Sequence, residues 1–129
     1  MVRAVQPTVM SEALPPDIAT MRDSARILLT DNAEPLPLDE LDTLARTLRG
    51  HIRLLLPEVA SAAWREPKDS IPRYCALACI GEARNKLRLG DGGTPPIRVS
   101  VARKLARVLN ALCGHYENLA GRHPESSVP

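Results

Sequence analysis

Two of the three cysteines of the chain, Cys75 and Cys79, stand four residues apart, and Glu82 follows three residues later. On a helix, residues four apart project only about 40° from each other, so the two thiols and the carboxylate could share one face. That arrangement would suit a bound metal ion. A structural zinc site, however, needs four ligands, and its thiolate pairs usually lie on turns with about two to four residues between the cysteines.

The remaining metal-ligand residues do not complete such a site. They are Cys113, His51, His115 and His123. Two residues apart on a helix, Cys113 and His115 point about 200° away from each other and cannot bind one ion. A disulfide between Cys75 and Cys79 is also disfavoured, because Cβ atoms four apart on a helix lie about 5–6 Å apart and a disulfide needs about 3.5–4.5 Å. We therefore predict no metal and no cofactor.

The segment YCALACIG, residues 74–81, carries no charged side chain on any side of the expected helix. Free cysteine is among the residue types most often found in protein cores. The sequence therefore predicts that Cys75 and Cys79 are buried all round in a helical core and that thiol reagents react with them slowly.

His115 and Cys113 are the residues through which the chain could act as a small helical enzyme or a ligand-binding protein. In that hypothesis they would serve as an acid–base group and a ligand contact in the interior of the helical domain. A lone histidine beside an apolar seam is more often a packed residue than a catalyst. We therefore favour a non-enzymatic protein, assign no catalytic residue, and keep the enzyme or ligand-binding protein as the alternative.

The two halves of the chain differ in charge. The first 66 residues carry 7 basic and 10 acidic side chains, whereas the remainder carries 10 basic and 5 acidic ones. Five arginines of the basic half fall on shared helix faces, and we predict that they bind an acidic protein partner: Arg73, Arg84, Arg88, Arg103 and Arg107. A solvated face is the simpler interpretation. Nucleic-acid binding is disfavoured, since the loop before residue 96 is too long for a helix-turn-helix and no aromatic residue is expected to be exposed.

Four segments show the helical repeat of apolar residues that would position these side chains. They span about 16–29, 38–65, 70–90 and 96–120. In the second segment the apolar seam comprises Leu41, Ala45, Leu48, Ile52, Leu55 and Val59. Pro57 lacks the amide proton that this helix would use, so we expect a kink there. Asp69 or Ser70 can cap the third helix at its start, and Gly90 can close it.

Short connections between successive helices predict an all-α antiparallel four-helix bundle at residues 15–121. The alternative is an irregular packing of four or five helices, with a true break at Pro57. Residues 1–14 and 122–129 show no apolar period, so we predict disordered tails. No apolar run reaches the about 20 residues that a membrane span needs, and three cysteines suggest reduced thiols, so we predict a soluble cytoplasmic protein. Homo-oligomerisation stays open.

Three stretches carry a resemblance to a known family: RGHIRLLLPEV, IPRYCALACIGEARNKL and ARKLARVLNALCGHYENL. Over about residues 38–120 the chain resembles a family of small streptomycete proteins of unknown function, domain of unknown function 6415, which is labelled "natural product biosynthesis protein". The resemblance implies a helical accessory protein of secondary metabolism and supplies no catalytic residue. We expect a non-enzymatic adaptor or regulator that acts through protein contact in an actinobacterial cytoplasm.

Overall fold

A computed structural model of the chain describes residues 14–31 and 34–122. It contains four helices, α2 (Ile18–Leu29), α3 (Leu38–Trp64), α4 (Ile71–Leu87) and α5 (Pro95–Arg122). Of the described residues 79% are helical and none lies in a strand, which confirms the all-α prediction. The predicted tails fall almost wholly outside the described residues. Arg122, which was assigned to the C-terminal tail, is instead the last residue of α5.

Side chains near the helix ends explain where α2 and α4 begin. Asp17 caps α2, because its Oδ1 accepts a hydrogen bond from the backbone N–H of Thr20 at 3.1 Å. Ser70 caps α4 by accepting from the N–H of Arg73 at 3.3 Å. Of the two predicted caps for α4, Ser70 is therefore the one used.

The glycine prediction after α4 needs a correction. α4 ends at Leu87, and the residue that follows, Arg88, keeps right-handed helical dihedrals, so no glycine is needed to close the helix. The left-handed conformation instead occurs at Gly92 in the loop, with φ of +88°. A Cβ atom there would stand 2.5 Å from Ile97 Cγ2, so the turn into α5 requires glycine at this position.

α3 passes through Pro57 without a break. The helix is continuous from Leu38 to Trp64 although Pro57 lacks the N–H that would bond the carbonyl of Arg53. Apolar side chains on both sides of the proline, Leu55, Leu56 and Val59, are buried and hold the helix in place. The alternative fold with a fifth helix is therefore not the one observed.

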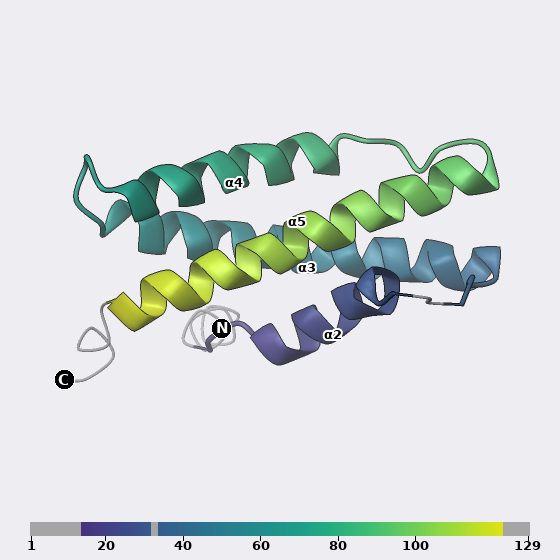
Figure 1. Ribbon diagram of the computed structural model, residues 1–129, viewed down its shortest axis with the longest axis horizontal. Helices are drawn as coiled ribbons and strands as arrows, with labels where there is room; N and C mark the ends of the chain where they lie inside the picture. The colour runs from purple at the N-terminus through teal and green to yellow at the C-terminus, as the bar shows by residue number, and fades with distance from the viewer. Residues whose placement is uncertain (1–13, 32–33, 123–129) are drawn as a thin grey trace, which may run out of the picture.

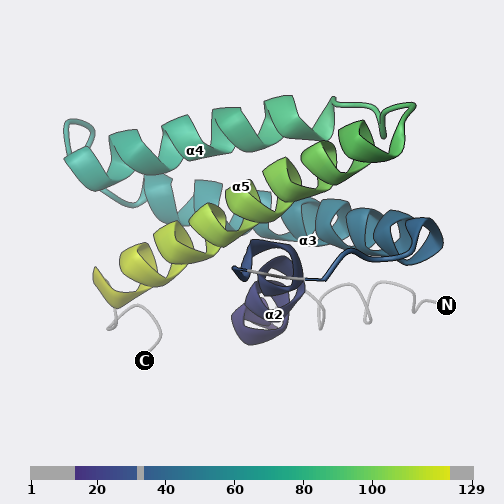
Figure 2. The same ribbon diagram turned by 45° about the vertical axis from the view of Figure 1, so that its right-hand side comes forward.

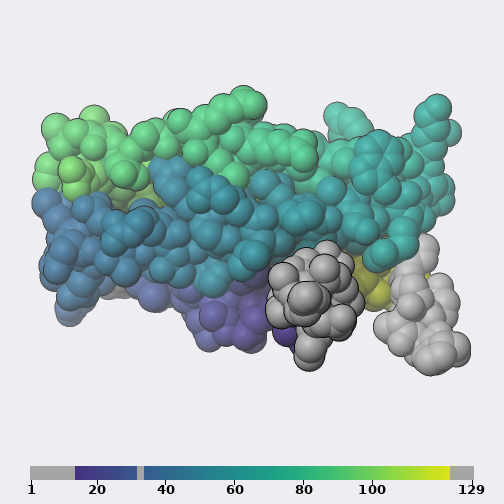
Figure 3. All heavy atoms as spheres, turned by 180° about the vertical axis from the view of Figure 1, so that it is seen from behind, coloured from purple at the N-terminus to yellow at the C-terminus, as the bar shows by residue number. Residues whose placement is uncertain are grey.

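The three long helices run in alternating directions, and α3 and α5 lie between α4 on one side and α2 on the other (Figure 1). α5 packs against all three other helices. α2 is short and is seen almost end-on in Figure 2, where the other helices still run across the picture, so it crosses them obliquely. From behind, α3 forms much of the surface (Figure 3). The fold is a helical bundle in which α5 is the central element.

The core is built from leucine, isoleucine, valine and alanine. The six residues of the predicted α3 seam are all buried, as predicted. They pack against the buried face of α5, which includes Leu105, Leu109 and Leu112, each fully inaccessible to solvent. Among the described helices none is long and apolar enough to cross a bilayer.

Candidate functional site

The structure separates the three cysteines. Cys75 is exposed, Cys79 is partly buried and Cys113 is fully buried. The prediction of an all-round buried helix is therefore wrong for Cys75. α4 lies at the edge of the bundle and packs on α3 and α5 along one side only, so just Ala76, Ile80 and Ala83 are buried. An uncharged stretch of small side chains can face water without a large penalty, and the absence of charge did not indicate burial.

The surroundings of the two inner thiols favour their protonated form. Burial raises the pKa of Cys79, and the nearby Glu82 carboxylate raises it further. Burial also raises the pKa of Cys113. Across residues 14–31 and 34–122 no three histidine, cysteine or acidic side chains come close enough together to hold a metal ion. The pair at 75 and 79 therefore offers two separate thiols, of which Cys75 is the more accessible.

The thiols should react with iodoacetamide in a fixed order. We expect Cys75 to be alkylated fastest, Cys79 more slowly, and Cys113 only when the bundle opens, because exposure falls in that order and burial raises the pKa of Cys79 and Cys113. Peptide mass spectrometry over a time course measures the three rates separately. Equal rates for Cys75 and Cys113 would contradict the arrangement of α4 and α5.

His51 is a partly buried histidine on α3. Its Nε2 lies 3.3 Å from Ser24 Oγ, so α3 and α2 meet at this pair. Burial lowers the pKa of His51, and the carboxylate of Asp17 partly opposes that shift. Beside it lies a surface hollow of about 290 Å³, lined by residues 14–17 and by Thr20, Met21, His51, Leu54 and Glu58. The histidine is a packed boundary residue, as the sequence indicated.

The pKa of His51 predicts a loss of stability in mild acid. Its ordinary pKa is 6.5 and the folded value is lower, so near that pH the unfolded chain binds more protons. Above pH 6.5 His51 therefore does not lower the free energy of unfolding. As the pH falls below 6.5, the free energy of unfolding decreases. Urea unfolding of the wild type and of His51→Gln as a function of pH measures this effect. The variant should show the smaller decrease, and an equal decrease would contradict it.

Cys113 and His115, through which the chain could act as an enzyme, lie apart from the described hollows. Cys113 is fully buried in the core and His115 is partly buried on another side of α5. Neither residue lines any of the four surface hollows described here. The two side chains therefore do not form a common ligand site with those hollows.

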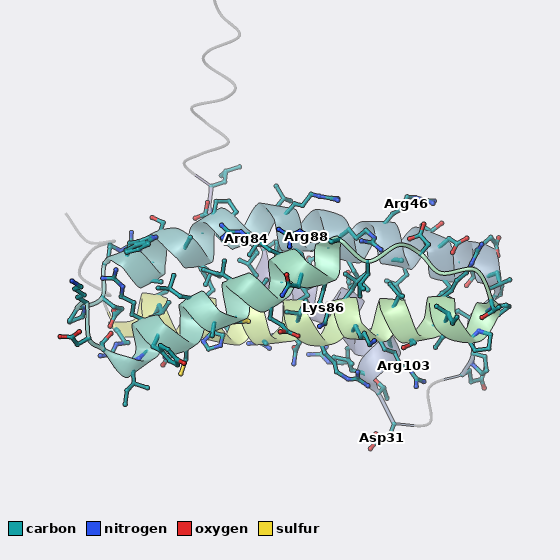
Figure 4. All side chains as sticks on the ribbon, turned by 90° about the horizontal axis from the view of Figure 1, so that it is seen from above. Asp31, Arg46, Arg84, Lys86, Arg88 and Arg103 are labelled. Atoms are coloured by element: carbon teal, nitrogen blue, oxygen red, sulfur yellow. The ribbon has the colours of Figure 1, made fainter. Side chains whose placement is uncertain are left out.

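The five predicted arginines lie on two helices and differ in their surroundings. Arg84 and Arg88 are exposed on the side of α4 next to α3, whereas Arg103 projects beyond α5 on the opposite side of the molecule (Figure 4). Arg107 lines a groove between α4 and α5. Arg73 is partly buried, and its guanidinium stacks over the ring of Trp64 at 4.1 Å. The exposure of Arg84, Arg88, Arg103 and Arg107 agrees with the outward faces expected on two separate helices, and their binding of a partner stays a prediction.

The end of the bundle where α3 turns into α4 carries exposed apolar side chains that the sequence analysis missed. Ile71 and Tyr74 are each 74% exposed and lie one turn apart, beside a hollow of about 330 Å³. Trp64 at the end of α3 is 61% exposed. We call these three residues the α3–α4 end. The expectation that no aromatic residue is exposed is therefore wrong.

The sequence did contain a signal for this surface. Two of only three aromatic residues, Trp64 and Tyr74, flank the turn between two helices, and Ser70 and Pro72 fix the start of α4 close by. Trp64 contacts Arg73, which the fold brings next to it. The Nη1 of Arg73 donates to the carbonyl of Glu66 at 3.3 Å, and this hydrogen bond holds the guanidinium over the indole ring.

Comparison with known proteins gives one match. A family model described as "Family of unknown function (DUF6415)" matches residues 19–121. No curated protein and no solved structure matches the chain significantly.

Proposed function

The chain belongs to this family of unknown function, DUF6415. From its exposed side chains, we propose that it is a non-enzymatic helical accessory protein, an adaptor or regulator, that acts by protein–protein contact. The observation that carries the proposal is the exposure of Trp64, Ile71 and Tyr74 at one end of the bundle. Single exposed apolar residues are common, but several large ones at one end are typical of interaction sites.

The residue types at the α3–α4 end are those that dominate binding energy in protein interfaces. Tryptophan, tyrosine and arginine are enriched among residues whose truncation weakens complexes most. Trp64 and Tyr74 have few rotatable bonds, so they lose little entropy when a partner covers them. Arg73 already restrains the indole ring through its stacking contact. The surface is therefore organised before the partner arrives.

The charge around the α3–α4 end favours an acidic partner. Arg65, Lys68 and Arg73 surround it, whereas Asp69 is the one exposed carboxylate of the turn, since Glu66 is buried and accepts from Arg122 Nε at 2.9 Å. Complementary charge at the rim of an interface increases the association rate and selects partners of the opposite sign. Arg84, Arg88, Arg103 and Arg107, which are exposed elsewhere on α4 and α5, add to the positive charge of this half of the chain.

We propose the natural product biosynthesis of an actinobacterium as the process, and its cytoplasm as the location. The supporting observations are the family resemblance and a composition with 14 arginines against 3 lysines, which is typical of high-GC actinobacterial genomes. An accessory role fits a chain in which His115 and Cys113, the residues of the enzyme alternative, line none of the four described hollows.

A paired set of surface variants tests the proposal. Capture from extract of the source organism should recover a partner with the wild type and lose it with Ile71→Ser/Tyr74→Ser, because those substitutions remove exposed apolar contacts without touching the core. The control is Ile27→Ser/Leu54→Ser, which removes two exposed apolar side chains elsewhere. Both variants should melt like the wild type.

Three outcomes would contradict the proposal. The first is recovery of the same partners by both variants. The second is capture of DNA or RNA with a steep dependence on salt, which would indicate nucleic-acid binding instead. The third is turnover of a small molecule that depends on His115, which would support the enzyme alternative. A concentration-dependent dimer lost only in Ile71→Ser/Tyr74→Ser would show that a second copy of the chain covers this surface.

A further inference from the structure

A second feature of the surface lies away from the α3–α4 end. A groove of about 340 Å³ runs between α4 and α5, lined by Cys79, Glu82, Lys86, Lys104, Arg107, Val108 and Ala111. Its volume is in the range of small-molecule sites, which start at about 300 Å³. Cys79 and Ala111 are the short uncharged side chains of its lining.

The groove has an apolar end and a cationic end. On α4 its lining extends from Cys79 to Lys86, and on α5 from Lys104 to Ala111, which is about 10 Å in each case at 1.5 Å per residue. The two helices are antiparallel (Figure 1), so Lys86 and Lys104 lie at the same end, next to the connecting loop. Figure 4 shows Lys86 on the side of α4 that faces α5. The small side chains of Cys79 and Ala111 lie together at the other end.

The cations of the groove exceed its carboxylates. Lys86 Nζ donates to Glu82 Oε2 at 2.6 Å, so the single carboxylate of the lining is already paired. Within residues 14–31 and 34–122, neither Lys104 nor Arg107 forms an ion pair or a hydrogen bond through its side chain. Both side chains belong to exposed residues, and both line the groove. An anion entering the cationic end would therefore find two donors without a competing carboxylate.

We propose that the α4–α5 groove binds a small amphiphilic carboxylate, with its carboxylate at Lys104 and Arg107 and its hydrocarbon part along Val108, Ala111 and Cys79. Arginine suits this role because its guanidinium can donate two parallel hydrogen bonds to a carboxylate. The groove is about 10 Å long and open to solvent, so it covers part of the hydrocarbon of a medium-chain acid such as decanoate. A long or branched acyl chain would extend into solvent.

The probe for this proposal is decanoate, and Cys79 is a reporter inside the groove. We expect decanoate to slow the alkylation of Cys79 by iodoacetamide several-fold and to leave Cys75 unchanged, because Cys75 is exposed outside the groove. Decylammonium, which has the same chain length and the opposite charge, should not protect Cys79. Calorimetry of decanoate binding gives the dissociation constant for each variant.

Matched variants separate the groove from general positive charge. Lys104→Glu/Arg107→Glu should weaken decanoate binding at least about tenfold, because it removes both cationic donors and places two carboxylates where the ligand's carboxylate would bind. Arg84→Glu/Arg88→Glu makes the same change in charge on the other side of α4 and should leave binding unchanged. Ala111→Leu should abolish binding by filling the apolar end. Ile71→Ser/Tyr74→Ser should bind decanoate normally, so this test is independent of the proposed partner surface.

Three results would overturn the proposal. One is equal protection by decylammonium, and another is equal weakening by Arg84→Glu/Arg88→Glu. The third is protection of Cys79 by a glutamate-rich helical peptide but not by decanoate, which would show that the groove holds an acidic protein segment.

Discussion

Replacing Leu109 with alanine should lower the free energy of unfolding by about 3 kcal/mol, within the about 2–5 kcal/mol typical of buried leucine truncations. Leu109 lies near the middle of α5 and is fully inaccessible to solvent. Because α5 packs against each of the other three helices, the resulting cavity cannot be closed by a shift of one neighbour. Urea unfolding followed by circular dichroism measures the change.

The matched control for this prediction is Leu54→Ala. Leu54 is a leucine in the middle of a long helix as well, but it is 66% exposed. Its truncation should change the free energy of unfolding by no more than about 0.5 kcal/mol. Equal effects at the two positions would show that α5 is not the central helix of the bundle.

The second large effect is expected at Arg49, whose side chain is only 12% exposed. Its guanidinium donates from Nη1 to the carbonyl of Leu87 at 3.1 Å and from Nη2 to the carbonyl of Leu89 at 2.8 Å. It also lies 3.4 Å from Asp91 Oδ1. The last carbonyls of a helix have no partner inside it, so α3 supplies through Arg49 the donors that close α4.

Arg49→Leu should therefore lower the free energy of unfolding by about 2 kcal/mol, from the loss of charge-assisted hydrogen bonds to carbonyls that remain partly covered. Arg49→Lys should recover only part of this, because one ammonium cannot reproduce the planar fork of the guanidinium. Arg53→Leu, an exposed arginine one turn further along α3, is the control and should have little effect. If Arg49→Leu and Arg53→Leu unfold at the same urea concentration, Arg49 does not close α4.

Helix positions and the α3 seam could be predicted from the sequence because they depend on local spacing. The steps of three and four residues between Leu41 and Val59 determine which side of α3 is apolar, and Ser70 acts on the N–H of Arg73 three residues later. α3 continues through Pro57 to Trp64, so the break is not observed, while the kink expected at Pro57 stays a prediction.

The surface of α4 could not be predicted because it depends on where the helix lies in the bundle. Small uncharged side chains such as Cys75 and Ala78 suit both a core and an exposed edge, so the segment 74–81 gave no indication of which side faces water. The surroundings of the arginines could not be predicted for a related reason. Spacing along one helix relates Arg103 to Arg107, but it does not show that neighbouring helices place them beside different hollows.

Contacts between segments that are distant along the chain could not be predicted from the sequence either. The groove pairs Lys86 with Lys104 and Arg107 only after the loop containing Gly92 turns α5 back along α4. Arg49 reaches the end of α4, 38 residues further along the chain, through the same antiparallel packing. In the sequence these residues look like ordinary surface charges. Only the packing of the helices shows which of them contact a partner or line a groove.

The most direct measurement of the central claim, that the α3–α4 end is a partner-binding surface, is site-specific photocrosslinking in the source cells. A benzophenone amino acid at position 74 should form a crosslinked product with a partner protein. The same group at position 54, where Leu54 on α3 is 66% exposed against 74% for Tyr74, should not. Products of the same size and yield from both positions, or a product from position 54 alone, would contradict the account.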